Sequence, residues 1–309
     1  MRLVLIAGLT VACGEPDAAT PELLTCSPID LAALAPYAGC TAVIDVDEPL
    51  GGTATEVEVY GEHGELLRRV SRRDGEVVAQ SEFSYDTHLQ RVAEEAEGGV
   101  STTWTYDALG LLTERVIMSP GHVEVLTTVA SDTPCAIAES TSTLDDRVNE
   151  VRTWTFDERG RPLHTSVKTT AFAEDGYATE DFTYPDETVS ERIVSMWSDP
   201  EASGEPTRSL DVREHDADGR LLTETHFLGT EPIPANRQSS DRYEYDENGD
   251  PTLFERTRVD WMDGTESVTD TLETAWEARR PARTTVRKFG DRIAGRSWQW
   301  TCPETGERP

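Results

Sequence analysis

A short motif recurs along this chain of 309 residues and constrains its fold more than any other feature. It consists of an aromatic residue, aspartate, two variable residues and glycine, followed by an apolar or threonine-rich segment. Complete and degenerate copies begin at Tyr60, Tyr85, Tyr106, Phe156, Tyr184, His215 and Tyr245. The interval from 106 to 156 is roughly twice as long as the others, which predicts a decayed copy near Ser131.

Each copy predicts a β-hairpin. Aspartate is favoured at the first position of a type I turn and glycine at the fourth. The predicted turn residues are Asp107, Gly110, Asp157, Gly160, Asp216, Gly219, Asp246 and Gly249. Because one hairpin is not stable alone, neighbouring copies must pair. The sequence predicts an all-β fold of repeated antiparallel β-hairpins forming one extended, curved or coiled sheet. It leaves open whether that sheet closes on itself.

The segments TYDALGLLTE, TFDERGRPLH, EHDADGRLLTE and YEYDENGDPT resemble the YD repeats of the RHS family. The resemblance covers roughly residues 55–260. It implies long sheets of β-hairpins and a role in surface contact. The large RHS members wind such sheets into a shell around a toxin. This chain has seven recognisable copies and no conserved-core signature, so we expect it to be too small for a closed shell.

Residues 1–12 combine a basic start at Arg2 with an apolar run and small residues, directly before Cys13. This pattern predicts a signal peptide rather than a membrane-spanning helix. The residues before Cys13 resemble a bacterial lipobox, which implies that the Cys13 sulfur receives diacylglycerol. An ordinary secretory signal that is cleaved nearby is the alternative.

The remaining chain divides by composition into four parts. These are a tether (13–25), an N-terminal cap with a short helix (26–54), the hairpin-repeat domain (55–302) and a tail (303–309). Ser27, Pro28 and Asp30 predict the cap, the first position and an acidic first turn of this helix, and Pro36 predicts its end. We expect this helix and the strand before Cys302 to protect the edges of the sheet, because exposed edge strands invite aggregation.

Four cysteines remain if Cys13 is lipidated. An even number in an exported chain predicts disulfides. The candidates are Cys26, Cys40, Cys135 and Cys302, and all three possible pairings stay open. Their spacing matches no zinc-binding pattern, so we expect no metal there.

The charge of the chain is strongly negative, with 59 Asp and Glu residues against 28 Lys and Arg. Such a surface repels phosphate groups, so we expect no nucleic-acid partner. It also opposes anionic headgroups, so membrane attachment would come through the lipid anchor only.

No motif for a catalytic nucleophile, a phosphate loop or a dinucleotide site is present. Asp246 and Asp250 have EF-hand spacing, but Pro251 stands where the calcium loop needs glycine. We therefore predict no catalytic residues, no cofactor and no metal. A weaker alternative is that the turn aspartates line one edge and attract divalent cations.

Together these features favour a non-enzymatic lipoprotein of the bacterial cell envelope, lipid-anchored, whose hairpin repeats serve interaction or structure. Its partner would be an unidentified envelope or surface protein or glycan. Two alternatives stay open. One is an extracytoplasmic polysaccharide-active hydrolase, whose acids would come from separate loops. The other is a fragmentary relative of an RHS toxin system.

Overall fold

The computed structural model describes residues 24–26, 29–47, 53–169, 176–198, 201–260 and 263–303. The predicted signal peptide, Cys13, most of the tether, Ser27 and residues 304–309 of the tail lie outside these ranges. Across the described ranges, no helix has the length and apolar character needed to span a membrane.

Twenty strands dominate the part of the chain that the structure describes, together with one short helix and two 3-10 turns. The helical elements are α1 (Leu31–Leu34), η1 (Ala35–Tyr37) and η2 (Pro234–Asn236). The strands are β1 (Thr41–Asp47), β2 (Thr53–Tyr60), β3 (Leu66–Arg73), β4 (Glu76–Tyr85), β5 (Arg91–Ala96), β6 (Val100–Tyr106), β7 (Leu112–Ser119), β8 (His122–Ala130), β9 (Ile137–Leu144), β10 (Arg147–Phe156), β11 (Pro162–Thr169), β12 (Gly176–Thr183), β13 (Val189–Trp197), β14 (Thr207–His215), β15 (Leu221–Leu228), β16 (Arg237–Tyr245), β17 (Pro251–Val259), β18 (Glu266–Glu277), β19 (Arg280–Lys288) and β20 (Asp291–Thr301).

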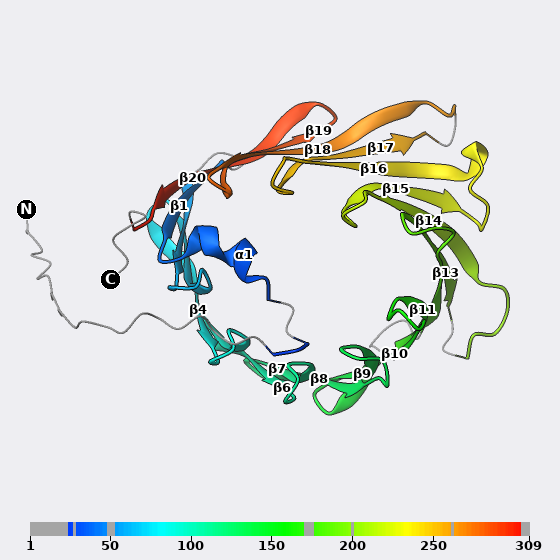
Figure 1. The fold of residues 1–309 in the computed structure, drawn as a ribbon, viewed down its shortest axis with the longest axis horizontal. Helices are drawn as coiled ribbons and strands as arrows, with labels where there is room; N and C mark the ends of the chain where they lie inside the picture. The colour runs from blue at the N-terminus through cyan, green and yellow to red at the C-terminus, as the bar shows by residue number, and fades with distance from the viewer. Residues whose placement is uncertain are drawn as a thin grey trace, which may run out of the picture.

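The strands form a closed ring (Figure 1). Each strand pairs antiparallel with its neighbours in sequence, and β1 also pairs with β20. The predicted all-β fold of antiparallel hairpins is confirmed. The sequence left open whether the sheet closes, and the pairing of β1 with β20 closes it. The hairpin β8–β9 turns at Ser131, where the sequence predicts a decayed copy, and a hairpin that the motif does not reveal, β18–β19, supplies additional strands.

Helix α1 lies inside the ring (Figure 1). Asp30 caps it, because its carboxylate accepts hydrogen bonds from the backbone N–H groups of Ala32 and Ala33 at 2.9 and 3.3 Å. The expectation that α1 and the last strand protect sheet edges was wrong, because the described sheet has no edge strand. The sheet also begins at β1, within the segment 26–54 that we expected to form a cap.

Two disulfides connect distant parts of the chain. Cys40 and Cys302, 262 positions apart in sequence, join the start of β1 to the end of β20. Cys26 and Cys135, 109 positions apart, join the N-terminal segment to the turn between β8 and β9. The first disulfide therefore links the chain covalently where the ring closes.

The turns of the repeat motif lie at one end of the ring, where the even-numbered strands finish. We call this end the motif rim. Asp107 is representative: its carboxylate accepts hydrogen bonds from the backbone N–H groups of Leu109 and Leu111 at 2.8 and 2.9 Å. The Gly110 N–H donates to the Asp107 carbonyl at 3.1 Å, and Gly110 has a positive φ of 90°. The same carboxylate hydrogen bonds recur at Asp86, Asp157, Asp216 and Asp246.

The copy at Tyr60 lacks the aspartate but keeps the turn. Gly61 occupies the aspartate position, and the Glu65 carboxylate accepts the His63 N–H at 3.0 Å. A Cβ atom at Gly61 would lie 2.1 Å from the Glu65 Oε1 atom. Glycine therefore leaves room for Glu65 to make the hydrogen bond that aspartate makes elsewhere.

The aromatic residues of the motif connect neighbouring hairpins. The Tyr106 hydroxyl donates a hydrogen bond to the carbonyl at the start of β5, Arg91, at 2.9 Å. Tyr85, Tyr184 and Tyr245 make equivalent bonds to the first residues of β3, β11 and β15. Two tryptophan indoles repeat this contact, from Trp276 to Pro251 and from Trp300 to Pro281, both at 2.8 Å. They extend the aromatic series beyond the copies visible in the sequence.

We expect Asp107→Ala to lower the free energy of unfolding by about 1 kcal/mol, because it leaves two backbone N–H groups without their acceptor. Asp107→Asn keeps an acceptor oxygen at the same position and should cost less than half as much. Urea unfolding of both variants measures the difference. Equal losses for Ala and Asn would show that the turn does not depend on this acceptor.

Candidate functional site

The inner face of the ring carries both apolar and charged side chains. Side chains alternate between the two faces of a strand, and directly paired residues share a face. Glu58, Ile44 and Trp298 face α1 across a cavity inside the ring. The residues that pair with Glu58, strand after strand from β2 to β14, all lie on the inner face. Arg192 and Asp211 belong to this series and therefore also lie on the inner face.

One group of charged side chains runs across five neighbouring strands, β13 to β17. Arg192, Asp211, His226, Asp241 and Arg256 make up this group, which we call the ion-pair ladder. Asp211 and Asp241 are only 4% and 1% exposed. The Asp211 carboxylate pairs with Arg192 at 2.5 Å and with the His226 Nδ1 atom at 2.6 Å. Arg256 donates two hydrogen bonds to Asp241, at 2.7 and 2.6 Å. The ladder therefore satisfies two buried carboxylates.

The contacts within the ladder shift the pKa values of its members. Burial by itself would raise the pKa of Asp211, but the hydrogen bonds from His226 and Arg192 outweigh it and hold the pKa below 3.8. The hydrogen bond to Asp211 raises the pKa of His226 above 6.5, although burial opposes this. Both shifts favour an ion pair between carboxylate and imidazolium.

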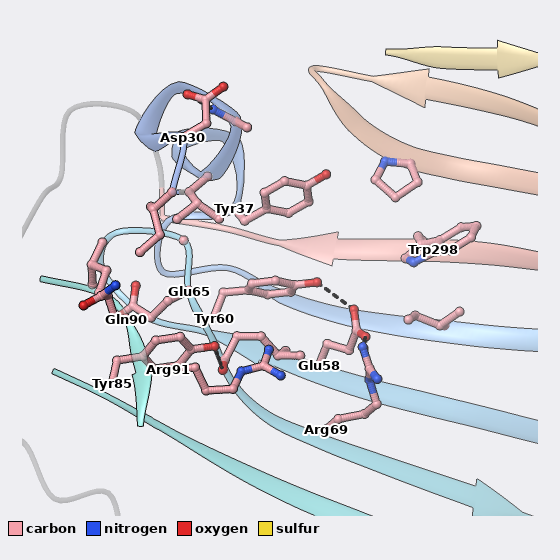
Figure 2. A pocket seen from close by; sticks show the side chains of 18 of the residues that line it. Asp30, Tyr37, Glu58, Tyr60, Glu65, Arg69, Tyr85, Gln90, Arg91 and Trp298 are labelled. Atoms are coloured by element: carbon pink, nitrogen blue, oxygen red, sulfur yellow. Dashed lines mark hydrogen bonds and ion pairs between the residues drawn. The ribbon is translucent and has the colours of Figure 1, made fainter. Parts of the chain in front are cut away.

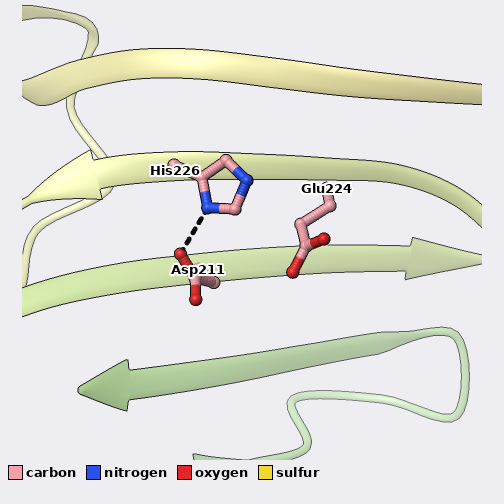
Figure 3. A group of neighbouring side chains, drawn as sticks. All are labelled: Asp211, Glu224 and His226. Carbon is pink, nitrogen blue, oxygen red and sulfur yellow. Dashed lines mark hydrogen bonds and ion pairs between the residues drawn. The ribbon is translucent and has the colours of Figure 1, made fainter. Parts of the chain in front are cut away.

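Asp211, Glu224 and His226 bring three possible metal-ligand atoms close together (Figure 3). Their ligand atoms lie within 4.8 Å of one another. However, Arg192 and His226 already neutralise Asp211, and the Arg213 Nε atom binds Glu224 at 2.7 Å. The carboxylates of this cluster are therefore already paired with cationic side chains of the protein.

The ladder predicts a pH dependence of stability. Folding raises the pKa of His226, so its protonated form stabilises the folded state. This contribution is complete below pH 6.5 and is lost as the pH rises through the folded-state pKa of His226. The lowered pKa of Asp211 contributes stability above pH 3.8 that is lost as the pH falls through the folded-state value. We therefore expect His226→Gln to flatten the alkaline side of the stability profile, measured by urea unfolding between pH 5 and 9. An unchanged profile would show that His226 does not carry this dependence.

A cavity of about 790 Å³ lies between α1 and the inner face of the sheet (Figure 2). Such a volume suits a small-molecule ligand. Aromatic side chains line it from the helix side and from four strands: Tyr37, Tyr60, Tyr85, Tyr106 and Trp298. Figure 2 shows Gln90 and Glu65 at one end of the cavity and Trp298 at the other.

The charged groups of the cavity wall have partners. The Glu58 carboxylate accepts a hydrogen bond from the Tyr60 hydroxyl at 2.6 Å and pairs with Arg69 at 2.8 Å. Burial and the hydrogen bond to Glu58 raise the pKa of Tyr60, so its phenol stays protonated. Arg296 lies 3.5 Å from Glu56, and the Arg91 guanidinium lies over the Phe83 ring at 4.7 Å from its centroid.

This arrangement does not favour hydrolysis. A glycosidase needs two carboxylates that act on opposite sides of a scissile bond. Three carboxylates line the cavity, and each has a structural role. Asp30 caps α1, Glu65 accepts the His63 N–H, and Glu58 binds Tyr60 and Arg69. The geometry therefore fits ligand binding better than acid–base catalysis.

The predicted turn residues are distributed around the motif rim and do not converge on one site. Their carboxylates already accept backbone N–H groups, and Asp157 and Asp216 also pair with Arg161 and Arg220 at 2.8 and 2.7 Å. Sequence reasoning did not identify the cavity or the ion-pair ladder. The alternation of charged residues within strands, as in RSLDVREH and LLTETHFL, was the available signal.

No protein-family model matches the sequence, and no curated protein is significantly similar to it. A porin-like protein from Bacteroides uniformis is 12% identical, with a TM-score of 0.38, over 85% of this chain and 97% of that chain. The Photorhabdus luminescens Tc holotoxin pore is 12% identical, with a TM-score of 0.28, over 80% of this chain and 14% of that chain. A TcdB2-TccC3-Cdc42 structure is 10% identical, with a TM-score of 0.21, over 82% of this chain and 19% of that chain. Similarities this weak identify neither a family nor a function.

Proposed function

We propose that this protein is an exported, non-enzymatic component of the bacterial cell envelope, and that its ring of RHS-like hairpins is a rigid frame for a binding cavity. The cavity between α1 and the inner face carries this proposal. It has ligand-sized volume and an aromatic wall, while its carboxylates are committed to structural hydrogen bonds. Lipid attachment at Cys13 would hold the ring at the membrane surface.

The binding role is tested by filling the cavity from α1. Ala32 and Ala33 are both exposed residues of this helix, but only Ala33 lines the cavity. Ala33→Trp should abolish binding of envelope components to the purified protein, whereas Ala32→Trp should leave it unchanged. Binding is measured by photo-crosslinking in envelope extracts followed by mass spectrometry. Identical crosslinked species with both variants would contradict a role for the cavity.

The envelope assignment is tested by intact mass spectrometry of the native protein from membrane and soluble fractions, without reduction. We expect a diacylated Cys13 in the membrane fraction and oxidised Cys26, Cys40, Cys135 and Cys302. Cys13→Ser should release the protein from the membrane. A membrane-bound Cys13→Ser variant would contradict lipid anchoring.

A further inference from the structure

We infer that the cavity binds an organic cation, through an ammonium or guanidinium group of the ligand that contacts Glu65 and the ring of Tyr85. This inference rests on the proposed function of the cavity as a binding site and names the chemistry of its ligand. Two copies of the repeat motif outside the cavity carry it, because each places an arginine of the protein itself at the equivalent position.

The copy that begins at Phe156 shows what this arginine does. Arg161 follows the turn glycine and pairs with the turn aspartate, Asp157, at 2.8 Å. Its guanidinium carbon also lies over the aromatic ring of the next copy, Tyr184, at 4.0 Å from the ring centroid. The protein therefore neutralises a turn carboxylate and covers an aromatic ring with the same cation. The same two contacts recur, at 2.7 and 5.5 Å, in the copy formed by His215, Asp216 and Arg220 and at the next aromatic ring, Tyr245.

The first copy of the motif lacks such a cation. Glu65 occupies the position of Arg161, and its carboxylate has no cationic partner among the described residues. The aromatic residue of the next copy is Tyr85, and no arginine in the described ranges lies over its ring. Both side chains line the cavity, and Figure 2 shows them at the end that Gln90 also lines. A cationic group of a ligand at this position would pair with the carboxylate and lie over the ring, as Arg161 does in its own copy.

One other copy has an acidic residue at this position. In the copy that begins at Tyr245, Asp250 follows the turn glycine, and Arg279 pairs with it at 3.7 Å. The other copies have neutral or basic residues there. Among the motif copies, Glu65 is therefore the acidic residue at this position whose charge is left to a ligand.

Asp30 adds a second negative charge to the cavity wall, from the start of α1. Across the part of the chain that the structure describes, its carboxylate has no cationic partner either. The arginines of the wall already have partners: Arg69 with Glu58 at 2.8 Å, Arg296 with Glu56 at 3.5 Å and Arg91 with Glu94 at 4.0 Å. The remaining charges of Asp30 and Glu65, in a chain of net charge −31, favour a cation and oppose an anion. Because Asp30 is exposed and Glu65 is half-buried, we expect Glu65 to contribute more.

The rest of the wall indicates an organic cation rather than a metal ion. A Ca²⁺ ion takes about six to eight oxygen ligands, and the described residues place no cluster of three acidic or histidine ligands in the cavity. Tyr37 and Tyr60 stack with ring centroids 5.3 Å apart, and Ile44 and Leu89 also line the cavity. These apolar surfaces can contact the hydrocarbon part of a ligand.

The inference is tested by isothermal titration of the full-length protein with two organic cations and their neutral isosteres. Butylguanidinium is compared with butylurea, and choline is compared with its uncharged carbon analogue, neohexyl alcohol. We expect at least one cation to bind about tenfold or more tightly than its isostere. Ala33→Trp, which fills the cavity from α1, should abolish this binding.

Variants of the first turn locate the bound cation. Glu65→Gln removes the charge but keeps an oxygen that can accept the backbone N–H of the turn, and it should weaken cation binding about tenfold. Gly61→Asp/Glu65→Arg gives this turn the aspartate and arginine of the copy at Phe156, so the new arginine should cover Tyr85 and abolish binding. The atoms nearest to a Cβ at Gly61 belong to Glu65, which the double variant replaces. The matched control is Glu62→Gln, which removes a charge from the same turn outside the cavity and should leave binding unchanged.

Thermal unfolding shows whether each variant is folded, and Glu65→Gln still tests the inference if the double variant is not. Lack of binding of both cations up to about 10 mM would overturn the inference. So would cation binding that neither Glu65→Gln nor the double variant weakens, since it would then reflect the net charge alone. If a neutral isostere binds as tightly as its cation and Ala33→Trp abolishes both, the cation inference fails but the cavity remains a binding site. If Ala33→Trp affects no ligand and no crosslink, the proposed function fails as well.

Discussion

The double variant Cys40→Ser/Cys302→Ser is expected to lose about 4–5 kcal/mol of unfolding free energy, because the disulfide closes a very long loop. The bond also joins the two strands at which the ring closes, β1 and β20. Their pairing has the largest sequence separation in the sheet, so without the disulfide its formation carries the full loop-closure entropy. We expect the loss of stability to be concentrated at the pairing of β1 with β20, which we call the seam.

Hydrogen exchange measured by mass spectrometry tests where the loss occurs. Protection should fall first in β1 and β20 of the double variant, while hairpins such as β10–β11 keep theirs. The matched control is Cys26→Ser/Cys135→Ser, which also removes a long-range disulfide but leaves the seam intact. If both double variants expose β1 and β20 equally, the Cys40–Cys302 bond has no special role in closure.

Removing the charge of Asp241 is expected to be the most destabilising single substitution in the ion-pair ladder. Asp241 is buried and accepts two hydrogen bonds from Arg256. Removing one partner of a buried ion pair lowers the free energy of unfolding by about 3–5 kcal/mol. Because the Arg256 side chain is 36% exposed and its charge can reach water, we expect Asp241→Asn to cost about 3 kcal/mol, at the lower end of that range.

The matched control is Asp181→Asn. The Asp181 carboxylate lies 2.7 Å from the His164 Nδ1 atom, but its side chain is 56% exposed. An exposed pair contributes at most about 1 kcal/mol, so this control should change stability little. Urea unfolding at pH 6 gives both values.

The Asp241→Asn/Arg256→Gln double variant should lose less unfolding free energy than the sum of the losses of the two single variants. Additive costs would show that the two residues do not act as a pair.

The local structure of this protein could be predicted from its residue types. Asp107 and Gly110 prescribe their turn because a carboxylate can bind backbone N–H groups two and four residues ahead, and glycine tolerates positive φ. The all-β class followed from repetition of that turn. A short helix close to α1 was also predicted, but Asp30 is its cap, whereas the sequence placed the cap at Ser27 and Asp30 in the first turn.

Tertiary structure alone decided that the sheet closes, which cysteines pair, and which side chains meet on the inner face. Arg192, Asp211, His226, Asp241 and Arg256 come from five strands, and only the pairing register brings them together. The cavity likewise depends on α1 lying inside the ring. A one-residue change of register would turn every side chain of a strand to the other face. Local sequence determined the hairpins because turn hydrogen bonds join near neighbours, whereas closure and the site depend on contacts between residues far apart in the chain.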